Sequence, residues 1–278
     1  MAEGHSVVRW ARWLAPLVGE PLLSIEAPQR WREIVDELFA AARRGKTPLA
    51  LREIHTHGKH LLLHLSDGTT IHCHGLMYGS WQVGKSGMKL RKPESRVRLR
   101  LRTAAHDAVF YNGPVVEFLS AQELAAHERI RALGPDILHG KFDREEVWRR
   151  LTRPKNRNRS LGDATLDQTI LAGVGNIFKS EGLFLARLDP RRLVGLVSRE
   201  EWERFLDSTL PLMQAACKSA GAIRTLPPNL RRGKRGRDAL NFVYFRSGRP
   251  CYFCGATLLR IAQGELQRST YFCPNCQK

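Results

Sequence analysis

The pattern of apolar and polar positions predicts that the first part of the chain is rich in strands. Residues 6–17 and 31–44 place apolar side chains at helical spacing. Short apolar or alternating runs then predict strands at residues 60–65, 69–73, 96–103 and 108–111. Ser66, Asp67 and Gly68 favour a hairpin turn between the first two of these strands.

After residue 120 the apolar spacing becomes helical. The predicted helices cover residues 121–132, 143–151, 167–171, 177–186 and 199–220. Residues 153–159 read RPKNRNR, which is too polar to pack and suits contact with phosphates. Residues 226–238 are rich in Pro, Gly and Arg, so they form either a flexible basic linker or an ordinary solvated loop. The pattern as a whole indicates a multi-domain α+β protein.

Charge narrows the range of partners. The 278 residues include 45 Lys and Arg against 27 Asp and Glu, and the excess extends from Arg9 to Arg268. A polyanion is the expected partner, nucleic acid being the commonest, although a basic but merely solvated surface is the plainer alternative. No stretch reaches the ~20 apolar residues of a membrane span, and the start lacks the features of a signal peptide. We therefore expect a cytoplasmic monomer without a membrane partner, associated with the nucleoid if the source is bacterial.

The cysteines indicate a metal site near the C-terminus. Cys251 and Cys254 form one Cys-x2-Cys pair, and Cys273 and Cys276 form a second pair eighteen residues later. Two such pairs close a tetrahedral zinc site, whereas four free thiols would not explain the shared spacing. With all four positions filled by sulfur, one zinc ion should fold the module and not catalyse. Cys73, standing alone, is expected to be a small buried hydrophobe, as is Cys217.

A glycine-containing stretch in the middle of the chain predicts a phosphate-binding helix start. Residues 166–190 read LDQTILAGVGNIFKSEGLFLARLDP. The sequence predicts a helix, a tight turn at Gly173 and Gly175, and a second helix that begins at Asn176. Free N–H groups at a helix start attract phosphate, although a generic helix-turn-helix would show the same pattern.

This stretch closely resembles the helix–two-turn–helix of the formamidopyrimidine-DNA glycosylase and endonuclease VIII family. Residues 241–251 and 267–273 also resemble the approach to that family's four-cysteine zinc finger and its ending. The resemblance implies an N-terminal β-sandwich at residues 1–120, a helix–two-turn–helix domain at 121–225, a linker at 226–240 and a zinc-finger hairpin at 241–278. It also implies an enzyme that flips a damaged base out of DNA, excises it and often nicks the strand.

Several residues match positions with known roles in the family. The resemblance implies that Asn176 and Arg268 hold phosphates at the lesion, and that Lys59 lies near the sugar of the damaged nucleotide. Leu76, Met77 and Tyr78 match the loop that fills the gap left by the flipped base, with Met77 as the expected wedge. Without the resemblance, two plainer alternatives remain open: Lys59 is an ordinary exposed lysine, and the three loop residues belong to the core.

The N-terminus departs from the family. Where the family usually has proline followed by glutamate, this chain has Ala2 and Glu3 after Met1. An α-amine has a pKa of about 7.7–8.0, so a useful fraction is neutral near pH 7 and attacks C1′ to form a Schiff base. Glu3 would be the general acid/base, and Arg268 completes the expected catalytic set with Lys59. Because an alanine imine must stay protonated to withdraw electrons, we expect base excision to persist and strand cleavage to be weaker.

The expected substrate is an oxidised pyrimidine. Residues 111–118 lack the arginine and phenylalanine that probe the opposite base in the 8-oxoguanine branch, and Tyr78 and Trp81 are closer to the endonuclease VIII branch. One alternative is a binder of damaged DNA that kept the fold and lost the chemistry. Another is an RNA- or ribosome-associated zinc protein, which explains the charge and the finger but not the pairing of Glu3 with Lys59.

Overall fold

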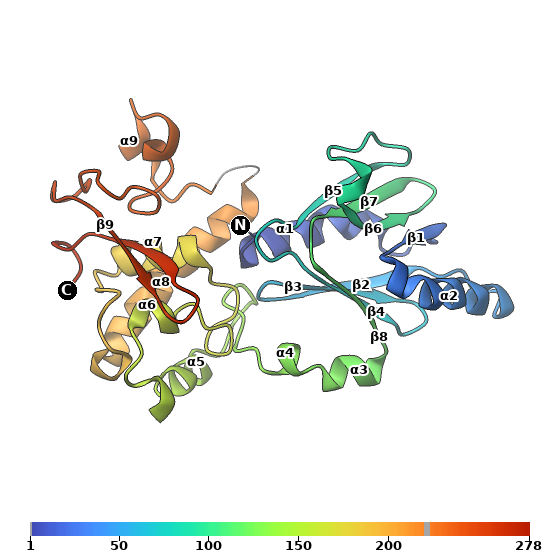
Figure 1. Ribbon diagram of the computed structural model, residues 1–278, viewed down its shortest axis with the longest axis horizontal. Coiled ribbons are helices and arrows are strands. Elements are labelled where there is room, and N and C mark those ends of the chain that lie inside the picture. Colours follow the sequence, from blue (N-terminus) through green and yellow to red (C-terminus); the bar gives the residue numbers. More distant parts are fainter. Residues whose placement is uncertain (1, 220–222) are drawn as a thin grey trace. The chain divides into compact units, whose positions relative to one another are not determined.

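The computed structural model describes residues 2–219 and 223–278, and its contacts divide the chain into two units. The first unit is Met1–Ala132 and the second is Leu133–Lys278 (Figure 1). Each unit has an apolar core cluster of its own. The division of the chain into four segments at residues 120, 225 and 240 stays a prediction. Along the described ranges, no helix is both long enough and apolar enough to cross a membrane.

The N-terminal unit contains two four-stranded antiparallel sheets, which confirms the expected β-sandwich. One sheet has the order β1 (Ser24–Glu26), β6 (Val97–Arg102), β7 (His106–Tyr111), β5 (Ser80–Lys85). The other has the order β2 (Leu51–His57), β3 (His60–Leu65), β4 (Thr70–His74), β8 (Val115–Leu119). The predicted strands therefore exist, and the hairpin at residues 66–68 joins β3 to β4 as expected.

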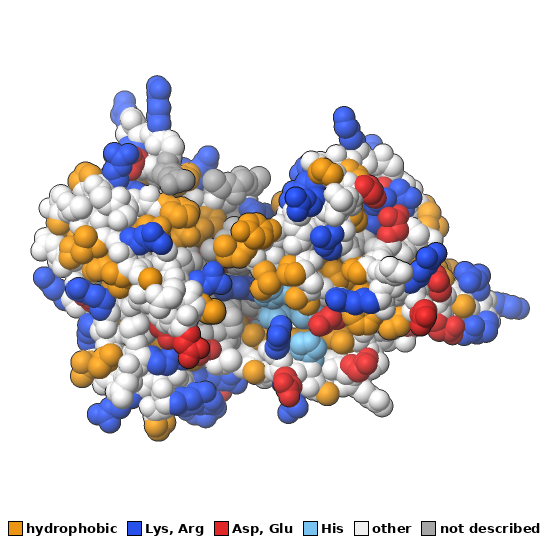
Figure 2. All heavy atoms as spheres, viewed as in Figure 1, with side chains coloured by type: hydrophobic (Ala, Val, Ile, Leu, Met, Phe, Trp, Pro, Cys, Tyr) orange, Lys and Arg blue, Asp and Glu red, His pale blue; other side chains and the backbone are white. Residues whose placement is uncertain are grey.

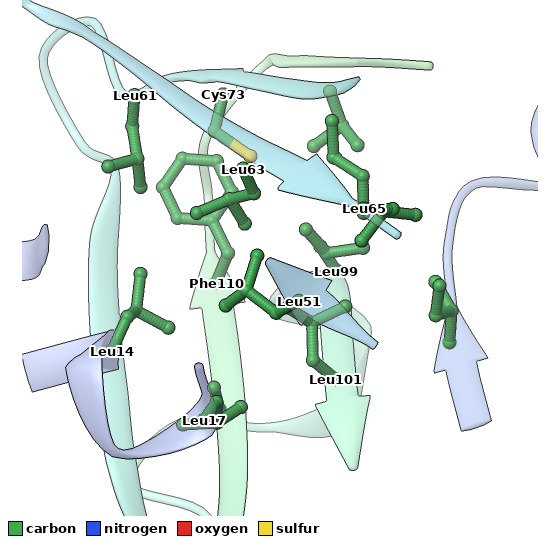
Figure 3. Packing of buried hydrophobic residues seen from close by; sticks show 14 of the residues in the cluster. Leu14, Leu17, Leu51, Leu61, Leu63, Leu65, Cys73, Leu99, Leu101 and Phe110 are labelled. Carbon is green, nitrogen blue, oxygen red and sulfur yellow. The ribbon is translucent and has the colours of Figure 1, made fainter. Parts of the chain in front are cut away.

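The two sheets share one apolar core because alternate residues of each strand face inward. On β3, Leu61, Leu63 and Leu65 are fully buried, and they pack in the same cluster as Leu99 and Phe110 of the other sheet. Figure 3 shows the labelled leucines of several strands converging with those of the first helical segment. Each fully buried leucine stabilises the unit by about 1.5–3 kcal/mol.

Helices surround this sandwich. They are α1 (Gly4–Leu14), continued by the 3-10 turn Ala15–Leu17, then α2 (Arg32–Arg44), α3 (Ala121–Ala126) and α4 (Glu128–Arg131). The prediction of one helix over residues 121–132 is wrong, because His127 adopts an extended conformation between α3 and α4. The imidazole of His127 accepts a hydrogen bond from the Ile130 N–H and caps α4.

The C-terminal unit is helical and ends in a hairpin. Its helices are α5 (Arg144–Leu151), α6 (Leu161–Ala164), α7 (Asn176–Leu185), α8 (Arg199–Lys218) and α9 (Pro228–Arg231), and its strands are β9 (Leu259–Gln263) and β10 (Arg268–Phe272). The predicted helix at residues 167–171 is wrong, since these residues form turns. Asp167 accepts from the Thr169 N–H, and the Gln168 side chain bonds Gly173 and Val174 across the turn. The predicted end of α8 at Ala220 lies outside the described residues.

Two polar segments are more ordered than the sequence predicts. Asn156 is buried and donates to the Arg150 carbonyl at 2.9 Å, while Arg159 pairs with Asp163 and Asp167. The prediction that residues 153–159 are too polar to pack is therefore wrong for Asn156 and Arg159, whose side chains bond within the unit, whereas Lys155, Arg157 and Asn158 are exposed. The stretch at residues 226–238 contains α9.

Candidate functional site

The N-terminus leads directly into a buried carboxyl group. Ala2 is half-buried, and Glu3 is fully buried at the N-cap of α1, where its carbonyl accepts the Ser6 N–H at 2.8 Å. A buried Glu is uncommon because removing a carboxylate from water is costly. Burial of Glu3 beside the candidate nucleophile is therefore a feature that the fold must stabilise.

A pocket of about 440 Å³ opens at Ala2. Its wall includes three cationic side chains, Arg9, Arg91 and Lys92, together with the aromatic residues Trp10, Trp13, Trp81 and Tyr111. Lys92 donates to the Ser80 hydroxyl at 2.8 Å, and the Tyr111 hydroxyl donates to Gln82 Oε1 at 2.8 Å. Cationic and aromatic walls together suit a ligand that carries phosphate and a flat ring. The sequence gives no signal that marks Arg9, Arg91 or Lys92, because they are spread among many other basic residues.

His5 lies one turn along α1 from this opening. It is buried, lies 3.1 Å from the Ser6 hydroxyl, and has its pKa lowered to about 3 by burial and then by the charge of Arg9. A lowered pKa means that the imidazole is neutral at pH 7. His5 is thus an uncharged polar group close to the N-terminal amine.

The candidate wedge residues stand on a tight, exposed loop. The Gly79 N–H donates to the Gly75 carbonyl at 2.8 Å, and a Cβ on Gly79 would lie only 2.3 Å from the Gly75 Cα. Between these glycines Leu76, Met77 and Tyr78 are 53%, 39% and 74% exposed. The alternative that these three residues belong to the core is therefore excluded. Leu76 has a positive φ of 44°, which leucine rarely adopts, so the turn holds it under strain.

Lys59 lies at the same end of the sandwich as this loop. It follows Gly58 in the turn between β2 and β3, and the next residue, His60, pairs directly with His74 at the end of β4. His74 leads into the Gly75 loop, and Gly79 of that loop lines the pocket at Ala2. The fold of the N-terminal unit therefore gathers Ala2, Lys59 and the exposed loop, which are far apart in sequence.

Histidines that the sequence analysis did not single out cover the outer face of the sheet β2-β3-β4-β8. His60 Nδ1 lies 2.8 Å from His72 Nε2, and the His60 and His74 rings are 4.5 Å apart. Burial is the largest cause that lowers the pKa of His60 to about 2 and that of His74 to about 4. Figure 2 shows histidine side chains (pale blue) reaching the surface as one group. Alternate histidines such as His72-x-His74 were the signal in the sequence, because residues two apart share a sheet face.

In the C-terminal unit, Asn176 begins α7 as predicted. Gly175 is the N-cap and supplies no side chain to the first N–H groups of the helix. Asn176 is buried, and its Oδ1 has no hydrogen-bond partner within the part of the chain that the structure describes. A helix start without a side-chain cap, next to an unsatisfied buried amide, is an arrangement that an anion such as phosphate would complete.

Buried polar contacts connect α7 to the hairpin that carries Arg268. Lys179 is fully buried, and its Nζ donates to Thr270 Oγ1 at 2.6 Å and to the Ser269 carbonyl at 3.2 Å. Arg268 is the first residue of β10 and is half-buried. Because Lys179 lies three residues beyond Asn176, one helix fixes Asn176 and also holds the strand of Arg268.

A second buried charge fixes the approach to the hairpin. The carboxyl oxygens of Glu181 accept the N–H groups of Phe242, Val243 and Tyr244 at 2.8–2.9 Å. Burial raises the pKa of Glu181, while these hydrogen bonds act in the opposite direction. The sequence shows Glu181 only as one position in a helix, so this role could not be predicted.

The four C-terminal cysteines have the geometry of a metal site. All four Sγ atoms lie within 4.8 Å of one another, with Cys251 to Cys276 at 3.8 Å and Cys254 to Cys273 at 3.5 Å. Zinc–sulfur bonds of about 2.3 Å put tetrahedral sulfur atoms roughly 3.8 Å apart. The residues present therefore fit one tetrahedrally bound ion. Cys73 and Cys217 are buried elsewhere, as expected of small hydrophobes.

Sequence comparison assigns both units to one family. The sequence model of the formamidopyrimidine-DNA glycosylase N-terminal domain matches residues 1–115. The model of the formamidopyrimidine-DNA glycosylase H2TH domain matches residues 133–226. Together these models cover well over half of the chain.

Two curated relatives are similar over most of the chain. A probable endonuclease 8 2 of Streptomyces coelicolor is 38% identical over 237 residues, which is 84% of this chain and 80% of the relative. An endonuclease 8 of Enterobacter sp. is 33% identical over 262 residues, covering 92% of this chain and 95% of the relative. Similarity therefore extends through both units.

Solved structures agree on the fold. A complex of Lactococcus lactis Fpg (MutM) with a Fapy-dG containing DNA has a TM-score of 0.77 at 24% identity and covers 99% of each chain. A complex of a mutant LlFpg with a THF containing DNA has a TM-score of 0.78 at 24% identity, covering all of both chains.

Proposed function

Because the chain belongs to the formamidopyrimidine-DNA glycosylase and endonuclease VIII family, we propose that it is a base-excision-repair DNA glycosylase. It acts as a monomer on damaged DNA, removes oxidised pyrimidines and then cleaves the strand at the abasic site. The observation that carries the proposal is that Ala2 lines a cationic and aromatic pocket and is followed directly by the buried carboxyl of Glu3.

DNA binding is supported by the positive charge of the chain and by groups of the C-terminal unit that suit contact with phosphate. The formal charge is +18. The α7 start at Asn176 and the side chain of Arg268 are proposed to hold two phosphates that flank an everted nucleotide. Met77, with Leu76 and Tyr78, enters the space that the nucleotide leaves, since apolar side chains replace lost base stacking.

The chemistry starts at the amine of Ala2 once Met1 is removed. The neutral amine attacks C1′, and the glycosidic C–N bond breaks with its electron pair leaving on the base, which takes up a proton. The C1′–O4′ bond then opens, with Glu3 giving O4′ its proton, and a protonated imine forms between Ala2 and C1′. The imine withdraws the electrons of a C2′–H bond, a base removes that proton, and the 3′ phosphate leaves. Lys59, at the same end of the unit, holds the sugar–phosphate in place.

Ala2 is expected to weaken the last step. A proline iminium is charged at every pH, whereas the imine of a primary amine withdraws electrons well only while protonated. Base excision does not depend on that charge to the same degree. We therefore propose that strand cleavage is slower than base release in this chain.

Zinc is the proposed occupant of the four-cysteine site. Cys251, Cys254, Cys273 and Cys276 would hold it, and four thiolates leave no position for substrate. Zinc there supplies folding energy to the hairpin, and the hairpin presents Arg268.

The preference for pyrimidines is supported by the connection between β7 and β8. Only residues 112–114 join these strands, and Gly113 is so close to the Phe110 ring that a Cβ there would lie 2.0 Å from it. This short turn leaves no loop to reach the base opposite the lesion. The alternative of a binder without chemistry has no support in the comparisons, whose curated relatives are named as endonucleases.

An excision assay tests the proposal. Duplexes that carry 5,6-dihydrouracil or 8-oxoguanine are incubated with the purified protein, and free base and nicked strand are measured separately. We expect faster release of dihydrouracil than of 8-oxoguanine, and base release that exceeds nicking. Glu3→Gln should abolish turnover, whereas Glu33→Gln, on the exposed face of α2, should leave it unchanged. Tight binding of both duplexes without release of either base would overturn the proposal.

A further inference from the structure

We propose that the N-terminal unit carries a second metal site, in which His72, Glu117 and His127 bind one zinc ion on the outer face of the sheet β2-β3-β4-β8. This site shares no residue with the four-cysteine site, which lies in the other unit. It is also separate from the groups proposed for catalysis.

The three side chains converge at distances that suit a metal ion. His72 Nδ1 lies 2.8 Å from Glu117 Oε2, His127 Nε2 lies 3.2 Å from the same oxygen, and all three ligand atoms lie within 4.8 Å of one another. Zinc bonds of about 2.0–2.1 Å to nitrogen and oxygen place tetrahedral ligand atoms roughly 3.3 Å apart. The ligand atoms therefore need only small movements to surround an ion.

Sheet register and a chain reversal produce this convergence. His72 on β4 pairs directly with Glu117 on β8, and both point away from the core, because their neighbours Cys73 and Val116 are buried in it. His127 comes from the break between α3 and α4, which follows β8. Three separate elements thus each supply one ligand, and each is fixed by backbone hydrogen bonds.

A neighbouring imidazole fixes the orientation of His72. His60 Nδ1 lies 2.8 Å from His72 Nε2, and the two rings stack at 5.0 Å. Histidines that bind metals usually direct their second ring nitrogen to a hydrogen-bond partner in this way. His127 Nδ1 accepts from the Ile130 N–H at 3.4 Å, a long hydrogen bond whose loss on metal binding costs little.

The three ligands favour zinc over calcium or magnesium, and they leave a fourth coordination position open. Two imidazoles and one carboxylate are ligands that zinc accepts readily, unlike calcium or magnesium, which prefer oxygen. The His72 side chain is 2% exposed, while those of His127 and Glu117 are 17% and 33% exposed. A fourth position therefore faces solvent, where water or an anionic oxygen would bind, in contrast to the closed four-cysteine site.

Metal content of the purified protein tests the site. The full chain is equilibrated with excess zinc chloride, freed of loosely bound metal on a desalting column, and assayed for zinc by mass spectrometry. We expect two zinc ions per chain for the wild type and one for His127→Asn or Glu117→Gln. Asn is chosen because its side-chain oxygen can accept at the N-cap of α4 as His127 does, so that α4 is perturbed as little as possible. Equilibration with Co²⁺ should add a visible absorption band without thiolate charge transfer, and this band should vanish in both variants.

His55→Ala is the matched control. His55 lies on β2, on the same outer face, but is exposed and contacts Glu53. It should keep two zinc ions. His60→Ala should weaken the second zinc roughly 10- to 100-fold in a chelator competition, since it orients His72. One zinc per chain in the wild type, or equal zinc content in His127→Asn and His55→Ala, would reduce the cluster to a hydrogen-bonded network and overturn the proposal.

Discussion

In the N-terminal unit, the residues proposed for chemistry stand at the end of a sandwich with an apolar interior. In the C-terminal unit, buried polar side chains fix the residues that are proposed to bind phosphate. Leu61, Leu63 and Phe110 typify the first interior. Lys179 and Glu181 are fully buried in the second and contact the hairpin region directly.

Size explains this difference. Two four-stranded sheets bury enough apolar surface to be stable, but a two-stranded hairpin does not. We therefore expect the hairpin to depend on the proposed zinc and on hydrogen bonds to α7. Gln277 adds a connection to the loop after α7, because it accepts from the Cys273 N–H at 2.8 Å and donates to the Leu188 carbonyl at 2.7 Å. The proposed catalytic residues on the sandwich and the proposed phosphate-binding residue on the hairpin should therefore respond to different perturbations.

Metal removal should produce the largest difference between the two units in hydrogen-exchange protection. A chelator that strips the four-cysteine site should remove folding free energy on the order of 10 kcal/mol from the hairpin. Hydrogen exchange followed by mass spectrometry should show loss of protection in peptides that span residues 251–276, while β3 and β7 stay protected. Loss of protection throughout β3 and β7 as well would contradict the expectation that only the hairpin depends on this metal site. Added zinc should restore the hairpin.

Glu181→Gln should destabilise the C-terminal unit by about 2–3 kcal/mol, because the new amide cannot accept all the N–H groups that the carboxyl now accepts. Urea unfolding monitored by hydrogen exchange would measure the change in each unit. Glu265→Gln, on the exposed β9–β10 turn, should have no effect. Equal destabilisation by the two variants would show that the buried carboxyl does not connect α7 to the hairpin.

Mild acid should destabilise the N-terminal unit. His5 has its folded pKa lowered from 6.5 to about 3, so the neutral form is favoured on folding. This group's contribution is fully present above its unfolded pKa and is lost as the pH falls from about 6.5 towards 3. Between pH 7 and pH 5, His5 alone should lower the free energy of unfolding of the N-terminal unit by an amount on the order of 2 kcal/mol.

His5→Gln should reduce the stability that the N-terminal unit loses between pH 7 and pH 5. The C-terminal unit contains one histidine, His139, which is exposed. The exchange protection of the C-terminal unit should therefore change little between pH 7 and pH 5. A larger acid effect on the C-terminal unit than on the N-terminal unit would contradict the assignment.

Arg268→Ala should have the smallest effect on stability and a specific effect on binding. Loss of one charged phosphate contact should weaken binding to abasic duplex by about 1.5 kcal/mol and reduce the slope of log K against log salt by about one. Fluorescence anisotropy at several salt concentrations measures both. Arg260→Ala is the control, since Arg260 is exposed on the partner strand and contacts Ser269. An unchanged salt slope in Arg268→Ala would leave the hairpin with a structural role alone.

The apolar pattern predicted the sandwich well because its strands alternate inward and outward residues. Residues 60–65 coincide with β3, and the short runs around it pair as expected. The pattern failed at residues 167–171, where the Asp167 side chain accepts from the Thr169 N–H and favours a turn over a longer helix. It also failed at His127, whose side chain begins a new helix.

The site was predictable where spacing or resemblance identified residues, and not where burial decides. The cysteine spacing predicted a cluster that the structure contains, and the exposed positions of Leu76 to Tyr78 agree with a wedge. Lys179 and Glu181 look like ordinary surface positions of a helix in the sequence. Only the packing of β10 and residues 242–244 against α7 gives them roles.

Borohydride trapping identifies the amine that attacks C1′, because it reduces the imine to a stable covalent bond. Protein with verified removal of Met1 is incubated with an abasic duplex and borohydride, digested, and sequenced by mass spectrometry. We predict a covalent adduct on the amine of Ala2, which acetylation of the N-terminus abolishes and Lys59→Ala retains. An adduct on Lys59, or no adduct although the abasic duplex is bound, would contradict the account.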